Sequence, residues 1–281
     1  MITAILAGAL AIGMPQQTDT TFAVRPGGTL ELEAMNGAVT IDTWDRPAMR
    51  VRATHGARTG IELEQSGSTV SIEAETRGQS GPVTFEVTVP RNYSVDIEGV
   101  NLRVTVHGIQ GSTTIENVQG PVIVRDVTGS VDVESVSGSI TIERVRGNIE
   151  VATVNQAIRI DGVRGSIDAE TANGSIVMRA VDASAVSATT VNGLVDYDGT
   201  VHDGGRYFLA AFNGSITMAV PERTNARIDI ETHNGRVESV FPVRVTGSGD
   251  REFSLTLGNG SARIELESYN GTVHLVRPRA R

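Results

Sequence analysis

Apolar and polar residues alternate along most of this chain, and from Gly111 the alternation falls into phrases of nine residues. Eight phrases follow without a gap: GSTTIENVQ, GPVIVRDVT, GSVDVESVS, GSITIERVR, GNIEVATVN, QAIRIDGVR, GSIDAETAN and GSIVMRAVD. The third and fifth positions are almost always apolar, mostly Val or Ile. An apolar residue at every second position is typical of a strand with one buried face. The Gly that opens seven of the eight phrases predicts turns between the strands.

The ninth position shows that the true repeat is eighteen residues long. It holds Gln119, Ser137, Asn155 and Asn173 in one set of alternate phrases, and Thr128, Arg146, Arg164 and Asp182 in the other. Two short strands in eighteen residues suit one coil of a β-solenoid, whose strands stack about 4.8 Å apart in two parallel sheets. An antiparallel meander would need an outer layer over its apolar face, and the sequence offers no amphipathic helix to supply one.

We therefore predict an all-β protein: a single-chain β-solenoid, or flattened parallel β-helix, with coils of about 18–21 residues and no significant helix. It spans residues 22–276, with a looser part at 22–100, a regular core at 111–182 and stretched coils at 183–276, followed by a basic tail at 277–281. We expect one continuous solenoid rather than independent domains. The eighth position is Val or Ala throughout, so we expect the turns to contribute to the core. Trp44, the only tryptophan, is expected to cap the core at its N-terminal end.

The order of these segments resembles the bacterial putative-adhesin family, also called toast-rack domains. The resemblance is carried by an opening LELEAMNGAVTIDTWDRPAMRVRA, the central G-[SN]-[IV]-x-[VI] phrases, then VESVFPV and a closing GNGSARIELESYNGTVHL. It implies an exported or envelope-associated β-solenoid with a suggested role in adhesion. It supplies no catalytic residues to transfer to this chain.

Composition removes several classes of function. The net charge of −9 disfavours binding to nucleic acid. The sequence contains neither cysteine nor lysine, which excludes disulfides, thiolate chemistry, Schiff-base lysines and P-loop lysines. Aromatic residues make up only 4% of the chain. Together with the regular repeat, these numbers favour a binding or scaffold protein over an enzyme.

The first residues resemble the apolar core of a signal peptide. An apolar run extends from Ile2 to Met14, which is too short to span a bilayer, and Ala9-Leu10-Ala11 is a candidate cleavage site. We predict a signal peptide at residues 1–13 and export to the periplasm, the cell surface or the medium, with no transmembrane segment after signal removal. The alternative is a buried N-terminal strand.

Acidic residues collect on one predicted face. If the third and fifth positions point inward, the fourth and sixth point outward, and the first, third, fifth and seventh phrases place a row of carboxylates there. The row contains Asp132, Glu134, Glu150, Asp168 and Glu170. Such a row could bind Ca²⁺ or Mg²⁺ weakly or dock a basic partner, and the alternative is a solvated surface that keeps the sheet soluble. The GGxGxD turns of calcium-dependent β-rolls are absent, so we expect no obligatory calcium.

A second candidate metal site is the sequence DYDGTVHD, which we expect to form an irregular loop between coils. Asp196, Asp198 and Asp203 could meet His202 there as metal ligands or as an acid–base group, or the segment could simply be a turn. The other histidines show no metal-binding spacing and are expected on the surface or in turns; they are His55, His107, His233 and His274.

The most consistent function is an exported, non-enzymatic β-solenoid that binds or scaffolds at the cell envelope, with no cofactor and no catalytic residues. Its partner would be an envelope component or a protein that the sequence does not name. Two alternatives remain: a polysaccharide-active β-helix enzyme, because such enzymes place acidic residues on one sheet face, and an intracellular structural scaffold.

Overall fold

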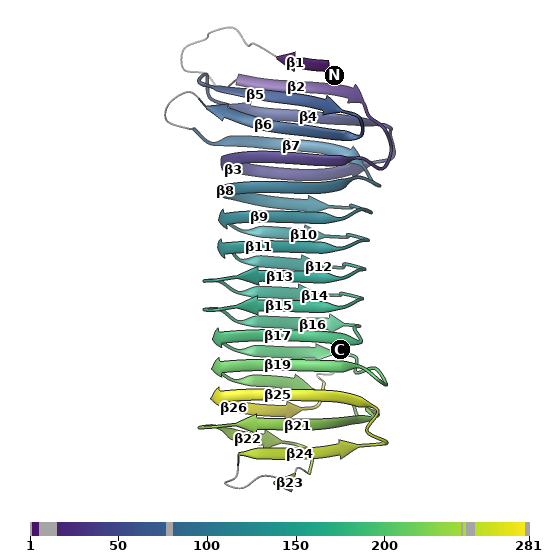
Figure 1. Cartoon of the computed structure of the whole chain (residues 1–281), viewed down its shortest axis with the longest axis vertical. Coiled ribbons are helices and arrows are strands. Elements are labelled where there is room, and N and C mark those ends of the chain that lie inside the picture. Colours follow the sequence, from purple (N-terminus) through teal and green to yellow (C-terminus); the bar gives the residue numbers. More distant parts are fainter. Residues whose placement is uncertain (1, 6–15, 77–80, 243, 246–250, 279–281) are drawn as a thin grey trace. The chain divides into compact units, whose positions relative to one another are not determined.

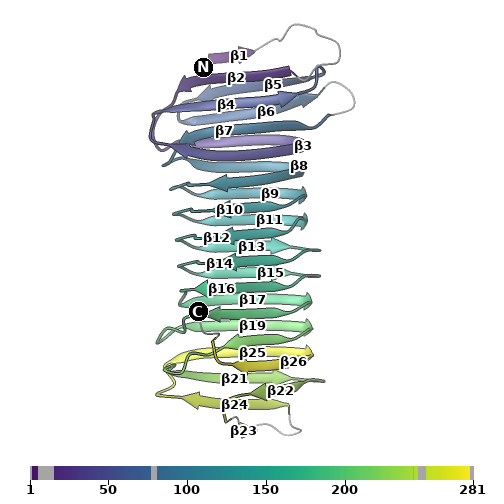
Figure 2. The same ribbon diagram turned by 180° about the vertical axis from the view of Figure 1, so that it is seen from behind.

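The chain forms β-strands throughout the residues that the structure describes, which are 2–5, 16–76, 81–242, 244–245 and 251–278. Figures 1 and 2 show this computed structural model from opposite sides. The predicted all-β solenoid is confirmed. In the same ranges, no helix is long and apolar enough to cross a membrane. The chain divides into two compact units, residues 1–138 (unit 1) and 139–281 (unit 2).

The regular part of unit 1 has the predicted eighteen-residue coil. Its strands are β8 (Ser94–His107), β9 (Thr113–Gln119), β10 (Val122–Arg125) and β11 (Val131–Ser137). The first half of β8 pairs in parallel with β9 and its second half with β10, so one strand contributes to both sheets. Val95, Thr113 and Val131 occupy equivalent places in successive coils.

The N-terminal part of unit 1 adds antiparallel strands to the parallel stack. The strands are β1 (Ile2–Ile5), β2 (Gln16–Ala23), β3 (Thr29–Trp44), β4 (Ala48–His55), β5 (Thr59–Ser66), β6 (Thr69–Thr76) and β7 (Val83–Pro90). β3 pairs in parallel with β8 and, on its other side, with β6 and β7. Beyond these strands, β4 pairs antiparallel with β7, β2 with β4, β5 with β6, and β1 with β5. Antiparallel pairing therefore closes this end of unit 1.

Trp44 does not close the core, so that prediction is wrong. It is half-buried at the end of β3, where its indole Nε1 donates a hydrogen bond of 2.7 Å to the carbonyl oxygen of Ala48. The guanidinium of Arg46 lies 5.2 Å from the centre of the indole ring. A whole layer of strands can satisfy the main-chain groups at the open end of a parallel stack, which a single side chain cannot do.

The predicted signal peptide is described only at β1, whose Ile2 lies opposite Gln65 of β5. Residues 6–15, which include the candidate cleavage site, lie outside the described residues. Cleavage and export therefore stay predictions.

Unit 2 continues the two-strand coil and lengthens it. Its first nine strands are β12 (Ile140–Glu143), β13 (Ile149–Thr153), β14 (Ile158–Asp161), β15 (Ile167–Thr171), β16 (Ile176–Val181), β17 (Ala185–Asn192), β18 (Val195–Gly199), β19 (Arg206–Asn213) and β20 (Ile216–Ala219). Ile149, Ile167, Val186 and Tyr207 are successive register partners, separated by 18, 19 and 21 residues. The predicted coil length of 18–21 residues is confirmed.

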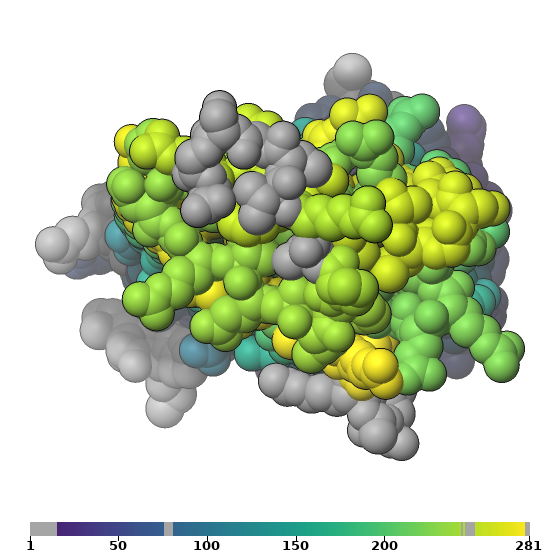
Figure 3. All heavy atoms as spheres, turned by 90° about the horizontal axis from the view of Figure 1, so that it is seen from below, coloured from purple at the N-terminus to yellow at the C-terminus, as the bar shows by residue number. Residues whose placement is uncertain are grey.

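The C-terminal coils of unit 2 depart from chain order. The strands are β21 (Ala226–Thr232), β22 (Arg236–Ser239), β23 (Arg244–Val245), β24 (Glu252–Leu257), β25 (Ala262–Asn270) and β26 (Thr272–Val276). β25 lies between β19 and β21, and β26 lies between β20 and β22. β24 then pairs antiparallel with β21 and with β23. Figure 3 looks onto this end of unit 2, with lime-green and yellow atoms in front.

The eighth position of each phrase is buried in only half of the phrases, which corrects the expectation that every turn contributes to the core. It is buried at Val127, Val145, Val163 and Val181, and exposed at Val118, Val136 and Val154. In the first group the preceding residue has a positive φ, as at Ala180 (51°), and this left-handed residue turns the chain back toward the core. In the second group the strand alternation continues through a buried seventh residue, such as Thr153, so the eighth points to solvent.

The third and fifth positions of all eight phrases are buried. Val133 is fully buried on β11, whereas Asp132 is partly exposed. We expect Val133→Asp to lower the free energy of unfolding by several kcal/mol, because it buries a charge without a partner. Asp132→Val should change it by less than about 1 kcal/mol. Thermal and urea unfolding of both variants measure this, and equal losses would contradict the inside–outside assignment.

Candidate functional site

The carboxylates predicted to bind cations lie on the outer faces of parallel strands, in rows of different length. In unit 1, Asp132 and Glu134 of β11 stand beside Thr114 and Glu116 of β9. The threonine interrupts the row that Asp132 would continue. The row that contains Glu134 and Glu116 is longer: it continues through Glu98 of β8 and Glu33 of β3 to Glu73 of β6, which makes five glutamates.

In unit 2 the row is short. Glu150 of β13 stands beside Asp168 of β15. On the next strand, Ser187 and Thr189 take the places beside Asp168 and Glu170. Within the described residues, no group of three histidines or carboxylates could hold a metal ion. Weak binding of divalent cations to these rows stays a prediction.

The second candidate site is not one irregular loop. Asp196 and Asp198 lie on strand β18, and only Asp203 belongs to the following turn. Asp196 pairs with Arg179 of the neighbouring strand β16. Asp203 accepts hydrogen bonds from Asn225 at 3.1 Å and from Ser261 at 2.8 Å. Asp196 and Asp203 therefore contact different neighbours.

Two buried tyrosines organise the turn after β18. The hydroxyl of Tyr197 donates to the carbonyl oxygen of Thr200 at 2.7 Å, and that of Tyr207 donates to the carbonyl oxygen of Ala183 at 2.8 Å. His202 lies 2.7 Å from Asp182, measured from Nε2 to Oδ1. Burial, followed by the charges of neighbouring groups, raises the pKa of Tyr197 far above its ordinary value. The turn is thus a structural element built on the tyrosine hydroxyls.

His55 is buried, so the expectation that it lies on the surface or in a turn is wrong. It ends β4, where its Nε2 lies 3.3 Å from the hydroxyl of Thr18 on β2. The remaining expected surface histidines, His107, His233 and His274, are exposed or half-buried.

A different surface feature appears in unit 2, where alternate strands end at one edge. We call it the edge stripe, and it consists, in stacking order, of Val154, Ala172, Val191, Phe212, Tyr269 and His233. Val191 is 44% exposed, Phe212 50% and Tyr269 42%. Large apolar side chains exposed in a row are typical of an interaction surface.

An asparagine ladder runs directly beside the edge stripe, because each stripe residue is followed by an asparagine. In stacking order the ladder consists of Asn155, Asn173, Asn192, Asn213, Asn270 and Asn234. Each side-chain amide donates to the amide oxygen of the asparagine before it in this order, at distances between 2.8 and 3.2 Å. Every inner member therefore donates one hydrogen bond along the ladder and accepts one.

The glycine after each ladder asparagine from Asn173 onward allows the coils to approach. A Cβ atom on Gly193 would lie 1.9 Å from the carbonyl oxygen of Gly174, and one on Gly214 would lie 1.5 Å from that of Gly193. Any larger residue would push the coils apart at this edge. The Asn-Gly pairs thus satisfy a stacking requirement in addition to forming turns.

Aromatic rings stack within the edge stripe. The ring of Tyr269 lies between those of Phe212 and His233, with centroid distances of 4.6 Å on both sides and interplanar angles of 8° and 12°. These rings line a groove of about 340 Å³, together with Val191 and the carboxylates Glu231 and Glu267.

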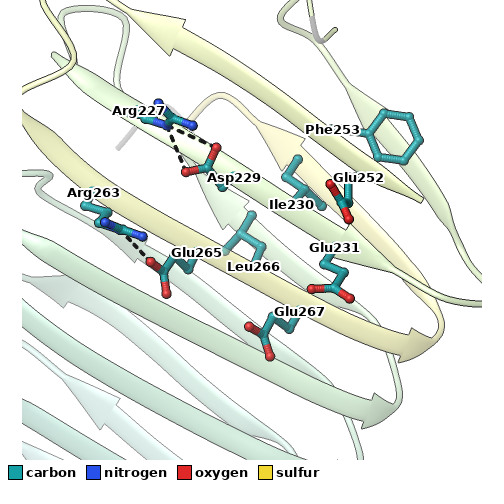
Figure 4. A pocket seen from close by; sticks show the side chains of 10 residues that line it. All are labelled: Arg227, Asp229, Ile230, Glu231, Glu252, Phe253, Arg263, Glu265, Leu266 and Glu267. Atoms are coloured by element: carbon teal, nitrogen blue, oxygen red, sulfur yellow. Dashed lines mark hydrogen bonds and ion pairs between the residues drawn. The ribbon is translucent and has the colours of Figure 1, made fainter. Parts of the chain in front are cut away.

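A second groove, of about 420 Å³, shares these two glutamates. Figure 4 shows Glu231 and Glu267 beside each other on β21 and β25. Arg227 pairs with Asp229 in the same groove, and Arg263 pairs with Glu265. Among the described residues, neither Glu231 nor Glu267 forms an ion pair with an arginine.

Partial burial raises the pKa of Glu267 above its ordinary value, and the nearby charges of Glu231 and Glu265 raise it further. The surface where the two grooves meet therefore combines stacked aromatic rings with two glutamates that, among the described residues, form no ion pair with an arginine.

With this geometry in place, comparison with known proteins is informative. The sequence profile of the Toastrack family, DUF4097, matches residues 28–276. The chain belongs to this family. The match confirms the resemblance read from the order of the repeats. No curated protein matches the chain.

Crystal structures of similar proteins cover most of this toastrack chain. A putative cell adhesion protein from Clostridium sporogenes is 13% identical, with coverage of 93% of this chain and 100% of that one and a TM-score of 0.26. A putative adhesin from Bacteroides fragilis is 11% identical, with coverage of 93% and 97% and a TM-score of 0.37. A putative adhesin from Parabacteroides distasonis is 10% identical, with coverage of 94% and 98% and a TM-score of 0.35.

The edge stripe of the toastrack chain was not recognised in the sequence, although a signal was present. The residue before each ladder asparagine is apolar or aromatic at five of six places. We predicted that the eighth positions contribute to the core because they hold Val or Ala throughout, and Val is ordinarily buried. Only the shape of the turn distinguishes an exposed eighth position from a buried one.

The asparagine ladder of unit 2 predicts that Asn192→Asp lowers the free energy of unfolding by an amount that depends on pH. In Asn192→Asp the new carboxylate cannot donate to Asn173 and faces its amide oxygen. We expect a loss of about 1–3 kcal/mol in the free energy of unfolding at pH 7. The same contact should raise the folded-state pKa of the new carboxyl, so the loss should shrink as the pH falls below about 4. Unfolding at both pH values measures it.

The matched control is Asn259→Asp, outside the ladder. The Asn259 side chain accepts a hydrogen bond of 3.1 Å from the backbone N–H of Ser261, and a carboxylate retains this role. Equal losses for the two variants would show that the ladder bonds contribute nothing.

Glu267→Gln should stabilise the toastrack fold at pH 7, because it removes a charge that the folded state disfavours. A carboxyl with a raised pKa in the folded state destabilises the protein above that pKa and has no such effect once protonated. The gain in Tm should therefore vanish at low pH. Glu265→Gln is the control, because it loses the ion pair with Arg263 and should give no gain. A lower Tm for Glu267→Gln at pH 7 would contradict the prediction.

Proposed function

We propose that this protein is an exported, non-enzymatic binding module of the cell envelope, active in adhesion or as a scaffold, which holds a macromolecular partner along the edge stripe of unit 2. The exposed row of Val191, Phe212 and Tyr269 carries this proposal. The fold does not require large side chains there, because Ala172 fills the same place in its coil. Large apolar residues held in water without a structural need favour an interaction.

The rigidity of this edge supports the same function. Buried hydroxyls hold the turns: Thr171 donates to the carbonyl oxygen of Gln156 at 3.1 Å, and Thr190 donates to that of Gly174 at 2.9 Å. The asparagine ladder adds bonds between the coils. A surface that is already ordered loses little conformational entropy when a partner binds.

An enzymatic reading would use Glu231 and Glu267 as the two carboxylates of a glycosidase. Both side chains are exposed on an open sheet face. Acid–base catalysis benefits from a site that excludes water, and an open face does not provide one. The stacked rings of Phe212 and Tyr269 also cover each other's faces, which a sugar-binding platform would leave free. These observations favour binding over hydrolysis.

Export rests on the apolar run at the N-terminus, and it places the binding surface where envelope partners are available. In-cell photo-crosslinking tests both parts of the proposal. The bacterium that encodes the chain would carry a photoreactive amino acid at Val191, with Arg159, exposed on the other sheet, as control.

We expect a saturable crosslink from position 191, recovered in the envelope fraction, and none from position 159. Crosslinked chain confined to the cytoplasm would refute export. Equal labelling from both positions, or none from position 191, would refute the edge stripe as a binding surface. Release of sugar by the purified protein from a polysaccharide panel would refute the non-enzymatic assignment.

A further inference from the structure

The spacing of the edge stripe limits what can lie along it. Neighbouring aromatic rings are 4.6 Å apart, close to the spacing of about 4.8 Å between parallel strands. An α-helix presents one apolar side chain about every 4.5–6 Å along its length when apolar residues recur at every third or fourth position. An extended chain presents side chains on one face about every 6.6 Å, which soon falls out of step with the coils. The stripe therefore matches a helix better than a strand.

The charges beside the stripe define the helix further. The residues two before Ala172, Tyr269 and His233 on the same outward face are Glu170, Glu267 and Glu231. These glutamates form one flank, while the neutral asparagine ladder forms the other. Arg251 lies at the end of the stripe, with its Nη1 3.2 Å from His233 Nδ1. Arg227 and Arg263 line the adjoining groove, where each pairs with a carboxylate. A basic partner is therefore favoured at the three glutamates, which flank half of the six stripe positions.

The same charges disfavour other occupants. A second copy of this chain carries a net charge of −9 and would bring its own glutamates against these. An anionic lipid surface would be repelled in the same way. Six rungs at about 4.8 Å span about 24 Å, which corresponds to a helix of about 16 residues.

We propose that the edge stripe of unit 2 binds a basic amphipathic helix of a partner protein, with apolar side chains on Val191, Phe212 and Tyr269 and basic side chains beside Glu231 and Glu267. This inference rests on the proposed binding function and names the chemistry of the partner. It follows the helix-in-groove mode of recognition, in which apolar anchors supply affinity and flanking charges supply orientation.

The test uses the full chain and a fluorescein-labelled peptide of about 18 residues, with Leu at every third or fourth position and Arg beside them. One control peptide has the same composition in scrambled order, and another has Glu in place of Arg. Fluorescence anisotropy measures Kd for each. We expect the amphipathic basic peptide to bind at least about tenfold more tightly than either control.

Protein variants locate the binding site. Tyr269→Ser and Val191→Ser should each weaken binding by about tenfold. Tyr269→Ser breaks the ring stack and could disturb the fold, so Val191→Ser, which leaves the stack intact, tests the stripe independently. Thermal unfolding of both variants shows whether each is folded. Val240→Ser is the matched control, because Val240 is 59% exposed but lies outside the stripe. It should leave Kd unchanged.

A second pair of variants tests the charges. Glu231→Gln combined with Glu267→Gln should weaken binding several-fold at low salt and flatten the dependence of Kd on NaCl, because screening acts on these charges. Asp161→Asn, which removes a charge from the other sheet, should do neither.

The outcomes separate the two proposals. If the scrambled peptide binds as tightly as the amphipathic one, or if Val240→Ser and Val191→Ser have equal effects, the inference that the stripe binds a helix is wrong. If the peptide with Glu in place of Arg binds as tightly as the basic peptide, the inference that the partner is basic is wrong. If position 191 nevertheless forms its crosslink in cells, the binding function stands and only the chemistry of the partner is wrong. If that crosslink also fails, both proposals fall.

Discussion

Parallel stacking requires every residue to tolerate a counterpart about 4.8 Å away in the next coil. Inside the core this is favourable, because Ile and Val pack well against copies of themselves, as Ile149 does beside Ile167. At the turn it excludes side chains, so Gly174, Gly193 and Gly214 follow one another. Beside those glycines it favours asparagine. A side-chain amide both donates and accepts hydrogen bonds, so it can bond to the same amide in the coil on either side. On the outer face it places equal charges side by side, as in the row of five glutamates from Glu73 to Glu134, and their repulsion costs stability.

The edge stripe follows from the same constraint. The asparagines and glycines must recur in each coil of this edge, so the residue before them also recurs and projects outward each time. A row of equivalent exposed positions therefore exists whatever side chains occupy it. In this chain the row changes from Val and Ala to Phe, Tyr and His toward the C-terminal coils. A repeated scaffold thus offers a distinct binding surface through substitutions at one position per coil.

Period and alternation were sufficient to predict the strands, the inward residues and the coil length, because those properties depend on nearest neighbours in sequence. The exposed eighth positions were not recognised, since Val118 and Val127 are the same residue type and it is the positive φ of Asp126 that turns Val127 inward. The grooves beside Glu231 and Glu267 depend on β25, which approaches from 57 residues away in sequence between Tyr207 and Ile264. No local pattern encodes such a pairing. The metal candidates came from alternation within each strand, which does not give the register between coils, and the register places Thr114 beside Asp132 and Ser187 beside Asp168.

The position of β25 also bears on how the protein is made. A growing chain can add coils to unit 2 in order up to β19 and β20, but their native neighbours are the last two strands of the sequence. β21 to β24 are synthesised before those strands and have no native place on the stack until β25 and β26 arrive. The open edge of β19 therefore waits, unpaired, until β25 has been synthesised. Completion of the fold depends on β25 and β26, so a chain that stops before them keeps an adhesive strand edge.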